Sequence, residues 1–362
     1  MSKDLLKRKR DDLSGKSKKI KTNNCPSNKV HDDEHIENIN IENTNIESTN
    51  IESTNIEFYY PPSDKLKTIF GYFNETNSIE KLPEYLTKED DMDYLSAEAY
   101  WSYFGGCGIP NKSNSTGELL TILDNMQQLQ DTIHTFTKIL YWIIAKEERD
   151  YTKTILAMAE GPLEGHMYAI MVHVYRNGIL GCEIDHKKAY TYAVKSAKCG
   201  NLIGKAWMGS YLLQEEVVDK DFEKGIQLLI ESADAGFPMA QHIIGSLYIC
   251  MNPTKENILK GLKYIEMAAD QFYNRSLVRL GDFLRIGQIP FKNENGICDS
   301  VKIFDKNKGF YYFKTAADNG DKHGMFAVAT MYKNGEGVEQ NIYKAKEYYR
   351  MAIDAGYKIT FL

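Results

Sequence analysis

Small and apolar residues between positions 324 and 356 recur at the spacing of two consecutive helices. The first stripe lies on one helical face, at Gly324, Val328, Ala329 and Tyr332. Two glycines then predict a helix end, because glycine readily takes the left-handed conformation of a C-cap: Gly335 and Gly337. The second stripe follows and is closed by Gly356: Ala345, Tyr348, Tyr349 and Ala352. Each helix has one apolar stripe, so the hairpin needs neighbours to bury it.

The same unit recurs along the C-terminal half of the chain. The closing residue of the second helix falls at Gly200, Gly236, Phe272, Gly320 and Gly356, which by subtraction are 36, 36, 48 and 36 residues apart. The small residue inside the first helix gives the matching spacings 36, 36 and 48, at Gly209, Gly245, Gly281 and Ala329. Two markers in different helices agree, which predicts a helical solenoid of period 36 with an insertion of 12 residues in its fourth unit.

The unit resembles the Sel-one-like repeat family, a relative of the tetratricopeptide repeat. The last copy carries the family pattern at Gly324, Val328, Ala329, Tyr332, Gly335, Gly337, Val338, Lys344, Ala345, Tyr348, Ala352 and Gly356. The resemblance covers about 165–357 and implies an all-α fold, an α-solenoid of antiparallel helical hairpins. We expect about five clear repeats, plus one or two degenerate ones. Proteins of this family commonly act as adaptors in complexes, in signalling and in protein quality control.

Three departures from the pattern carry their own expectations. Phe272 replaces a closing glycine, so we expect a different turn there, with the ring packed inward. The insertion at about 287–306 is readable as a tolerated loop extension. The chain finishes with the apolar segment 357–362, which we expect to fold back on the last helix. The alternative is that this tail meets a partner, including self-association with a second copy.

The first 57 residues predict a disordered N-terminal arm. Its basic part, 1–30, fits a nuclear import signal formed by Lys7, Arg8, Lys9, Arg10, Lys16, Lys18, Lys19 and Lys21. A solvated tail without a receptor is the alternative. The hypothesis of nucleic-acid binding has less support, since no aromatic residue lies among these charges to stack a base. The five-residue repeat at 36–57 forms no apolar stripe as helix or strand and predicts a spacer.

Packed structure is expected to begin at Phe58. Residues 58–136 predict an irregular helical region with a possible degenerate repeat at about 93–135, followed by the solenoid over 137–362. Within the irregular region, the glycines around Cys107 match the turn that ends a first helix. We therefore interpret Cys107 as part of a glycine turn and not as a nucleophile.

Composition and charge narrow the class of protein. The formal net charge of −6 and the pI of about 5.8 argue against a chain that coats nucleic acid. The six cysteines contain no C-x-x-C pair, which is typical of reduced thiols in a cytoplasmic or nuclear protein. No signal peptide or membrane span is evident, so we expect neither secretion nor membrane association.

The sequence contains few motifs typical of catalytic, metal-binding or phosphate-binding sites. His31 and His35 formally match the H-x-x-E-H zinc pattern, but the segment is acidic and of low complexity, and it lacks a third ligand. The remaining histidines are scattered, no nucleophile–base motif occurs, and no Gly-Lys-Ser/Thr follows the glycine pairs. We expect no metal site, no cofactor and no enzymatic activity.

The first helices predict a binding face. Positions two before and one after the small residue should line the inner wall of the solenoid. They are Ile170, His173, Trp207, Ser210, Ile243, Ser246, Arg279, Asp282, Ala327 and Thr330. Trp207 is the best anchor for a peptide, with packing against a neighbouring repeat as an equal alternative.

The leading hypothesis is a non-enzymatic adaptor that binds a protein or peptide through the inner face. Two other classes remain open. One is an enzyme or enzyme regulator with a site in 58–135, and the other is a nuclear DNA-associated factor that uses the basic arm. A steep decrease in binding with rising salt concentration would indicate the DNA-associated factor.

Overall fold

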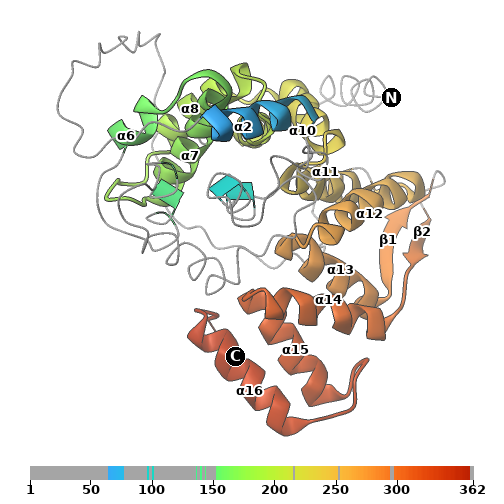
Figure 1. Cartoon of the computed structure of the whole chain (residues 1–362). Helices are drawn as coiled ribbons and strands as arrows, with labels where there is room; N and C mark the ends of the chain where they lie inside the picture. Colours follow the sequence, from blue (N-terminus) through green and yellow to red (C-terminus); the bar gives the residue numbers. More distant parts are fainter. Residues whose placement is uncertain are drawn as a thin grey trace. The chain divides into compact units, whose positions relative to one another are not determined.

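The computed structural model describes the repeat region and parts of the segment before it. The described residues are 64–76, 96–97, 100–101, 136, 139–140, 143, 152–214, 217–251, 253–293 and 297–358. The predicted basic arm and spacer, most of the possible degenerate repeat and the last four residues lie outside this set. Figure 1 follows the described helices and strands in chain order.

Ten helices form five consecutive hairpins among the described residues from 164 onward. Each second helix packs on its own first helix and on the first helix of the next hairpin. The pairs are α7 (Glu164–Asn177) with α8 (His186–Lys198), α9 (Leu202–Leu213) with α10 (Phe222–Asp234), α11 (Pro238–Met251) with α12 (Lys255–Asp270), α13 (Asn274–Ile286) with α14 (Lys306–Asp318), and α15 (Lys322–Asn334) with α16 (Ile342–Asp354). The predicted α-solenoid is confirmed.

Short polar side chains begin most of these helices. Asp321 accepts hydrogen bonds from the backbone N–H of His323 at 2.9 Å and of Gly324 at 2.8 Å. The same N-cap role is played by Asp185, Asn201, Asp221, Thr254, Asp305 and Asn341. Each cap satisfies backbone donors that have no partner inside the helix, a contribution of about 1 kcal/mol. Several of these positions repeat with the same period of 36, a marker that the sequence analysis did not use.

Every second helix ends in the same cap, and this corrects one expectation. After α12, the N–H of Phe272 donates to the oxygen of Ala269 and the N–H of Tyr273 to that of Ala268, at 2.8 and 3.0 Å. Gly236 and Phe237 make the equivalent pair of bonds after α10. Phe272 has a φ of 58°, so the predicted different turn is wrong: the left-handed cap is kept. The two backbone bonds outweigh a strain of about 1–2 kcal/mol, and the ring is only half-buried.

Glycine pairs mark the point where the two helices of a hairpin cross. A Cβ on residue 209 would lie 2.8 Å from the oxygen of Gly225, and one on residue 225 would lie 3.0 Å from the oxygen of Gly209. Gly245 and Gly261 form the same reciprocal contact between α11 and α12. In these two hairpins the small residue of the first helix is therefore structural, and it faces a glycine on the second helix.

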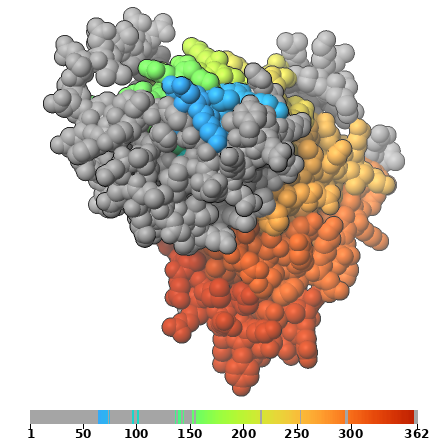
Figure 2. All heavy atoms as spheres, viewed as in Figure 1, coloured from blue at the N-terminus to red at the C-terminus, as the bar shows by residue number. Residues whose placement is uncertain are grey.

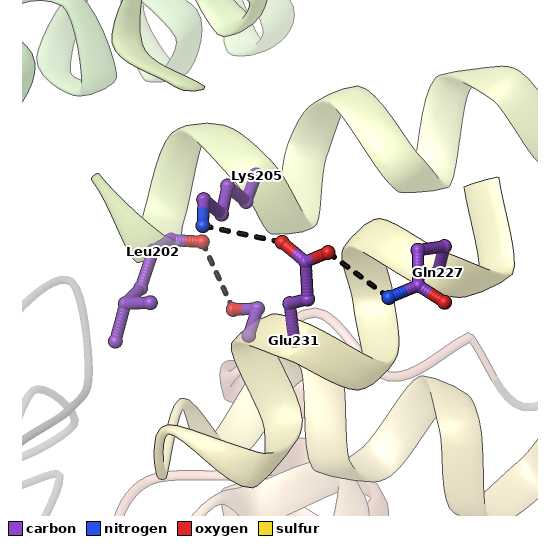
Figure 3. Close-up of polar contacts among 5 residues, drawn as sticks. Leu202, Lys205, Gln227 and Glu231 are labelled. Atoms are coloured by element: carbon purple, nitrogen blue, oxygen red, sulfur yellow. Dashed lines mark hydrogen bonds and ion pairs between the residues drawn. The ribbon is translucent and has the colours of Figure 1, made fainter. Parts of the chain in front are cut away.

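Polar contacts hold α9 against α10 beside this crossing. Figure 3 shows Glu231 between two partners: Lys205 Nζ lies 3.2 Å from one of its carboxylate oxygens, and Gln227 Nε2 donates to the other at 3.0 Å. Ser232 donates its hydroxyl to the backbone oxygen of Leu202 at 2.9 Å. One turn of α9 is thus fixed to the end of α10.

The insertion in the fourth unit forms a β-hairpin. Strand β1 (Gln288–Lys292) pairs antiparallel with β2 (Cys298–Lys302), and Ile289 lies opposite Val301. Ile289, Phe291 and Val301 are buried against the same core cluster as α12 and α13. The expected loop extension is thus an added two-stranded sheet in an otherwise helical fold. Alternating apolar residues in 288–292 were the sequence signal for it.

The described part of the N-terminal region packs onto the first repeat. Helix α2 (Asp64–Thr76) contributes Phe70, whose ring centroid lies 4.6 Å from that of Trp101 and 4.8 Å from that of His166. These side chains share one buried cluster with the first repeats. The short helices α6 (Thr152–Ala157) and η4 (Gly161–Leu163) connect to α7.

The chain turns back after α16. The ring of Tyr357 stacks on that of Phe326 at 4.4 Å, and its N–H donates to the oxygen of Ala352 at 2.8 Å. This first residue of the tail packs back as expected, and residues 359–362 lie outside the described set.

In the space-filling view α15 and α16, coloured red, reach the surface on the face shown (Figure 2). On α16, Lys346 and Arg350 are exposed where the equivalent residues in α10 are Ile226 and Ile230.

Candidate protein-interaction surface

The predicted binding residues all lie on first helices. The face comprises positions from α7, α9, α11, α13 and α15, and α7 also contacts α9 while α13 contacts α15. Ile170 is a correction, because its side chain is fully buried in the core and offers no surface. The others are half-buried: His173, Trp207, Ser210, Ile243, Ser246, Arg279, Asp282, Ala327 and Thr330.

Trp207 is both a packing residue and a surface residue. Its indole contacts buried residues of two core clusters, so one side of the ring belongs to the core. The guanidinium of Arg176, on the last turn of α7, lies 4.5 Å from the ring centroid. This cation–π contact joins two neighbouring repeats and leaves the ring half-buried.

Two of the predicted polar residues satisfy their own hydrogen bonds inside the repeat. His173 Nδ1 lies 3.0 Å from the side-chain nitrogen of Asn177, and burial followed by the charge of Arg176 lowers the pKa of His173 to about 4. Thr330 donates to the backbone oxygen of Phe326 at 3.0 Å. Both side chains stabilise their own helices, and at neutral pH His173 carries no charge.

Helix α13 carries the strongest charges on this face. Arg279 lies over the ring of Phe283 at 4.8 Å, and its Nη2 is 3.7 Å from Cys250 Sγ. Asp282 forms an ion pair with Arg285 at 3.6 Å. Burial raises the pKa of Asp282, and the charges of Arg285 and Arg279 oppose that rise. The guanidinium groups therefore surround a single carboxylate.

Sequence reasoning missed the arginines that flank the predicted positions. Arg176, Arg275 and Arg285 lie on first helices with Arg279, whereas Arg350 is the one arginine among the five second helices. The second helices carry lysines instead, for example Lys187, Lys224, Lys263, Lys308 and Lys346. Arginine is thus concentrated on two first helices, α7 and α13, whereas lysine occurs on both sets of helices, with Lys205, Lys322 and Lys333 on first helices.

A buried polar network lies at the start of α7. His166 Nε2 is 2.9 Å from Asn74 Oδ1, and His166 Nδ1 is 3.1 Å from the Tyr100 hydroxyl and 3.0 Å from Asn201 Nδ2. With Nε2 donating to Asn74 Oδ1, the single lone pair of Nδ1 is shared between the Tyr100 hydroxyl and the Asn201 amide, both of which can donate. Burial lowers the pKa of His166 to about 3, so the imidazole is neutral and joins α2 to the first repeat.

Metal and membrane chemistry find no support in the described ranges. No three His, Cys, Asp or Glu side chains come together there as a possible metal site. No helix in the same ranges combines the length and apolar character that a bilayer span requires.

Comparison with known proteins identifies the repeats. The model of the Sel1 repeat matches five segments, at 166–201, 204–237, 238–271, 293–321 and 322–357. A search of curated proteins finds no relative of this chain.

Solved structures with a similar chain path include a Sel1 repeat protein from Oxalobacter formigenes. It is 18% identical, with a TM-score of 0.44 over 57% of this chain and 78% of that one. The protective antigen c5321 of uropathogenic Escherichia coli, described as displaying an SLR fold, is 17% identical, with a TM-score of 0.44 over 65% of this chain and 49% of its own. The immunity protein Pa5087 of Pseudomonas aeruginosa is 18% identical, with a TM-score of 0.40 over 58% and 78%.

Four of the five repeat matches each cover one observed helical hairpin, and the match at 293–321 covers α14 but not α13. The spacing of the hairpins is that of the resemblance noted from sequence. The chain belongs to the Sel1 repeat family.

Proposed function

We propose that this protein is a non-enzymatic scaffold that binds a protein or peptide through the face formed by its first helices. The observation that supports this most directly is the half-buried set of residues from Trp207 to Thr330, which presents apolar and polar groups from consecutive repeats. Sel1 repeat proteins are generally protein-interaction scaffolds, and a stack of hairpins offers such an extended surface.

Three of the described histidines favour a structural role over catalysis. His166, His173 and His242 all have pKa values lowered by burial, and each makes side-chain hydrogen bonds within the fold. A histidine that is held neutral in a packed network is poorly suited to exchange protons with a substrate. An enzyme site in 58–135 remains the competing hypothesis, and residues outside the described set would have to carry it.

A capture experiment tests the proposal. The full-length protein, a variant with Trp207→Ala and Ser246→Gln, and a control with Leu259→Gln and Tyr343→Ala would each be used to capture partners from native lysate. The control changes exposed apolar residues on second helices. We expect the first-helix variant alone to lose a partner, and chemical cross-links from that partner to reach Lys322 and Lys333 on α15. Equal capture by all three proteins, or cross-links confined to second helices, would contradict the proposal.

The basic arm is proposed as a nuclear import signal, with the protein cytoplasmic or nuclear. The clusters that begin at Lys7 and at Lys16 support it by charge alone. A fluorescent reporter fused to residues 1–30 should accumulate in the nucleus, and a version with the two clusters changed to glutamine should not. An evenly distributed reporter would leave the arm as a solvated tail.

A further inference from the structure

Arginines from distant repeats act on one tyrosine. Burial raises the pKa of Tyr273, while the positive charges of Arg275 and Arg176 work against that rise. Arg275 lies on α13 and Arg176 at the end of α7, so these two charges come from helices that are far apart in the sequence. Tyr273 itself is half-buried.

Positive charges outnumber negative ones on the first helices, although Asp282 offsets part of the charge of Arg285 and Arg279. His242 packs beside Tyr273, with ring centroids 5.5 Å apart, and its Nδ1 is 2.9 Å from the Ser276 hydroxyl. Burial, then Arg275 and Arg279, lower the pKa of His242 to about 4, so it adds no charge at neutral pH. The first helices hold two carboxylates among their described residues. Asp282 is paired with Arg285, and Glu164 interacts with Tyr168 at the start of α7.

The guanidinium of Arg279 is held in place but not saturated. Phe283 supports it at 4.8 Å and Cys250 Sγ accepts weakly from Nη2 at 3.7 Å. Its Nε is buried and has no hydrogen-bond partner among the described residues, and the same is true of the Nε of Arg285. A buried Nε is not accessible to a ligand, so the donors that can meet an incoming acceptor are those on the terminal nitrogens of the half-buried Arg279 side chain. Because the side chain is already ordered, it loses little freedom when it binds a carboxylate.

We propose that the surface around Arg176, Arg275 and Arg279, called here the arginine face, binds an acidic peptide segment of a partner protein. Carboxylates of Asp and Glu would pair with the guanidinium forks, and an apolar side chain of the same segment would rest against Trp207 beside Arg176. This inference rests on the proposed function and names its ligand class. Nucleic acid is also anionic and is the competing ligand in the test below.

The test uses a defined probe. A fluorescein-labelled peptide of alternating Asp and Glu with one central Leu would be titrated with the full chain while fluorescence anisotropy is recorded. The double variant Arg275→Glu/Arg279→Glu should weaken binding by about 100-fold, at about tenfold for each reversed charge. The control Lys263→Glu/Lys346→Glu makes the same change in net charge at exposed residues of second helices and should leave affinity within about twofold. Circular dichroism would confirm that all variants are folded.

Two further probes decide the chemical class. A peptide in which phosphoserine replaces the acidic residues, and a single-stranded oligonucleotide of equal charge, would be titrated in parallel. Tighter binding of either one would overturn the assignment to an acidic peptide. An equal loss of affinity in the arginine and lysine variants, or no binding of the acidic probe, would overturn the arginine face as a binding site.

The lysate experiment separates this inference from the proposed function. One outcome is that the Arg275→Glu/Arg279→Glu variant still captures a partner that the Trp207→Ala/Ser246→Gln variant loses. That result would support the scaffold role and overturn the proposal of an acidic ligand. If no capture depends on the first helices, the scaffold role falls whatever the peptide does.

Discussion

A Cβ atom on residue 261 would lie 2.5 Å from the backbone oxygen of Gly245, and one on residue 245 would lie 2.7 Å from the oxygen of Gly261. The backbones of α11 and α12 therefore touch where they cross. Real Cβ atoms do not approach a carbonyl oxygen this closely, so neither position accepts a side chain unless the helices separate. The period of 36 found in the sequence is a period of such crossings.

Gly245→Leu should be severely destabilising. The new side chain would meet both Gly261 and Ile265, and the cost should exceed the roughly 1–3 kcal/mol typical of overpacking. Urea denaturation would measure the loss in free energy of unfolding. Lys263→Leu puts the same side chain on an exposed site of α12 and should change stability by about 0.5 kcal/mol or less. An unfolding midpoint unmoved by Gly245→Leu would refute the crossing.

The Phe272→Gly variant should be more stable than the Phe272→Ala variant. Both Phe272→Gly and Phe272→Ala remove the half-buried ring, but only alanine keeps a Cβ at a φ of 58°. The glycine variant should exceed the alanine variant by about 1 kcal/mol, the reverse of their order inside a helix. Thermal melting of the two variants gives the comparison, and a more stable alanine variant would mean that the left-handed cap is not strained.

Stability should decline as the pH falls below 6.5. The folded pKa of His166, about 3, is below its unfolded value of 6.5, so in that interval the unfolded chain binds a proton that the folded chain does not. This stabilisation is complete above pH 6.5 and is lost toward pH 3, at up to about 1.4 kcal/mol per pH unit. His173 and His242, with pKa values of about 4, act in the same direction.

Urea titrations at pH 7 and pH 5 would separate the share of His166. The His166→Gln variant is expected to be less stable than the wild type at pH 7, because it disturbs a buried network. It should also lose less stability than the wild type between the two pH values. Parallel pH profiles for the two proteins would show that His166 is not the titrating group.

Asp321→Ala should cost about 1 kcal/mol. The change removes the acceptor for the N–H groups of His323 and Gly324 at the start of α15. Asp318→Ala is the matched control, since Asp318 carries the same charge at the end of α14, where its unfavourable interaction with the helix dipole opposes a small gain from its surface ion pair with Lys314. We expect that control to be neutral or slightly stabilising in the same melting assay, and a loss equal to that of Asp321→Ala would point to general charge effects.

The repeat unit was readable because its signals are local. Gly335 has a φ of 69° and ends α15 where the sequence predicted a stop, and Tyr332 and Tyr348 stack across the hairpin from the two predicted stripes. The β-hairpin was missed because a spacing argument counts inserted residues without asking what they form. Phe272 was misjudged because a penalty for one residue was weighed without the two backbone hydrogen bonds that require the same turn.

The surface that we propose for binding was only partly predictable. Position within the repeat placed Trp207 and Arg279 on first helices, because helical periodicity assigns faces. It could not show that Ile170 is fully buried, since burial depends on what packs over a position from elsewhere in the chain. It also could not relate Arg176 to Arg275, which lie 99 residues apart by subtraction.

The sequence by itself determined the helical hairpins, their period and the family, because caps, glycines and apolar stripes act over a few residues. The tertiary structure decided which side chains meet. Arg176 and Arg275, from different repeats, both oppose the rise that burial causes in the pKa of Tyr273, and long-range packing joins Asn74 and Tyr100 to His166. These contacts depend on how whole helices are placed, a property of the sum of many small packing energies and not of any local pattern.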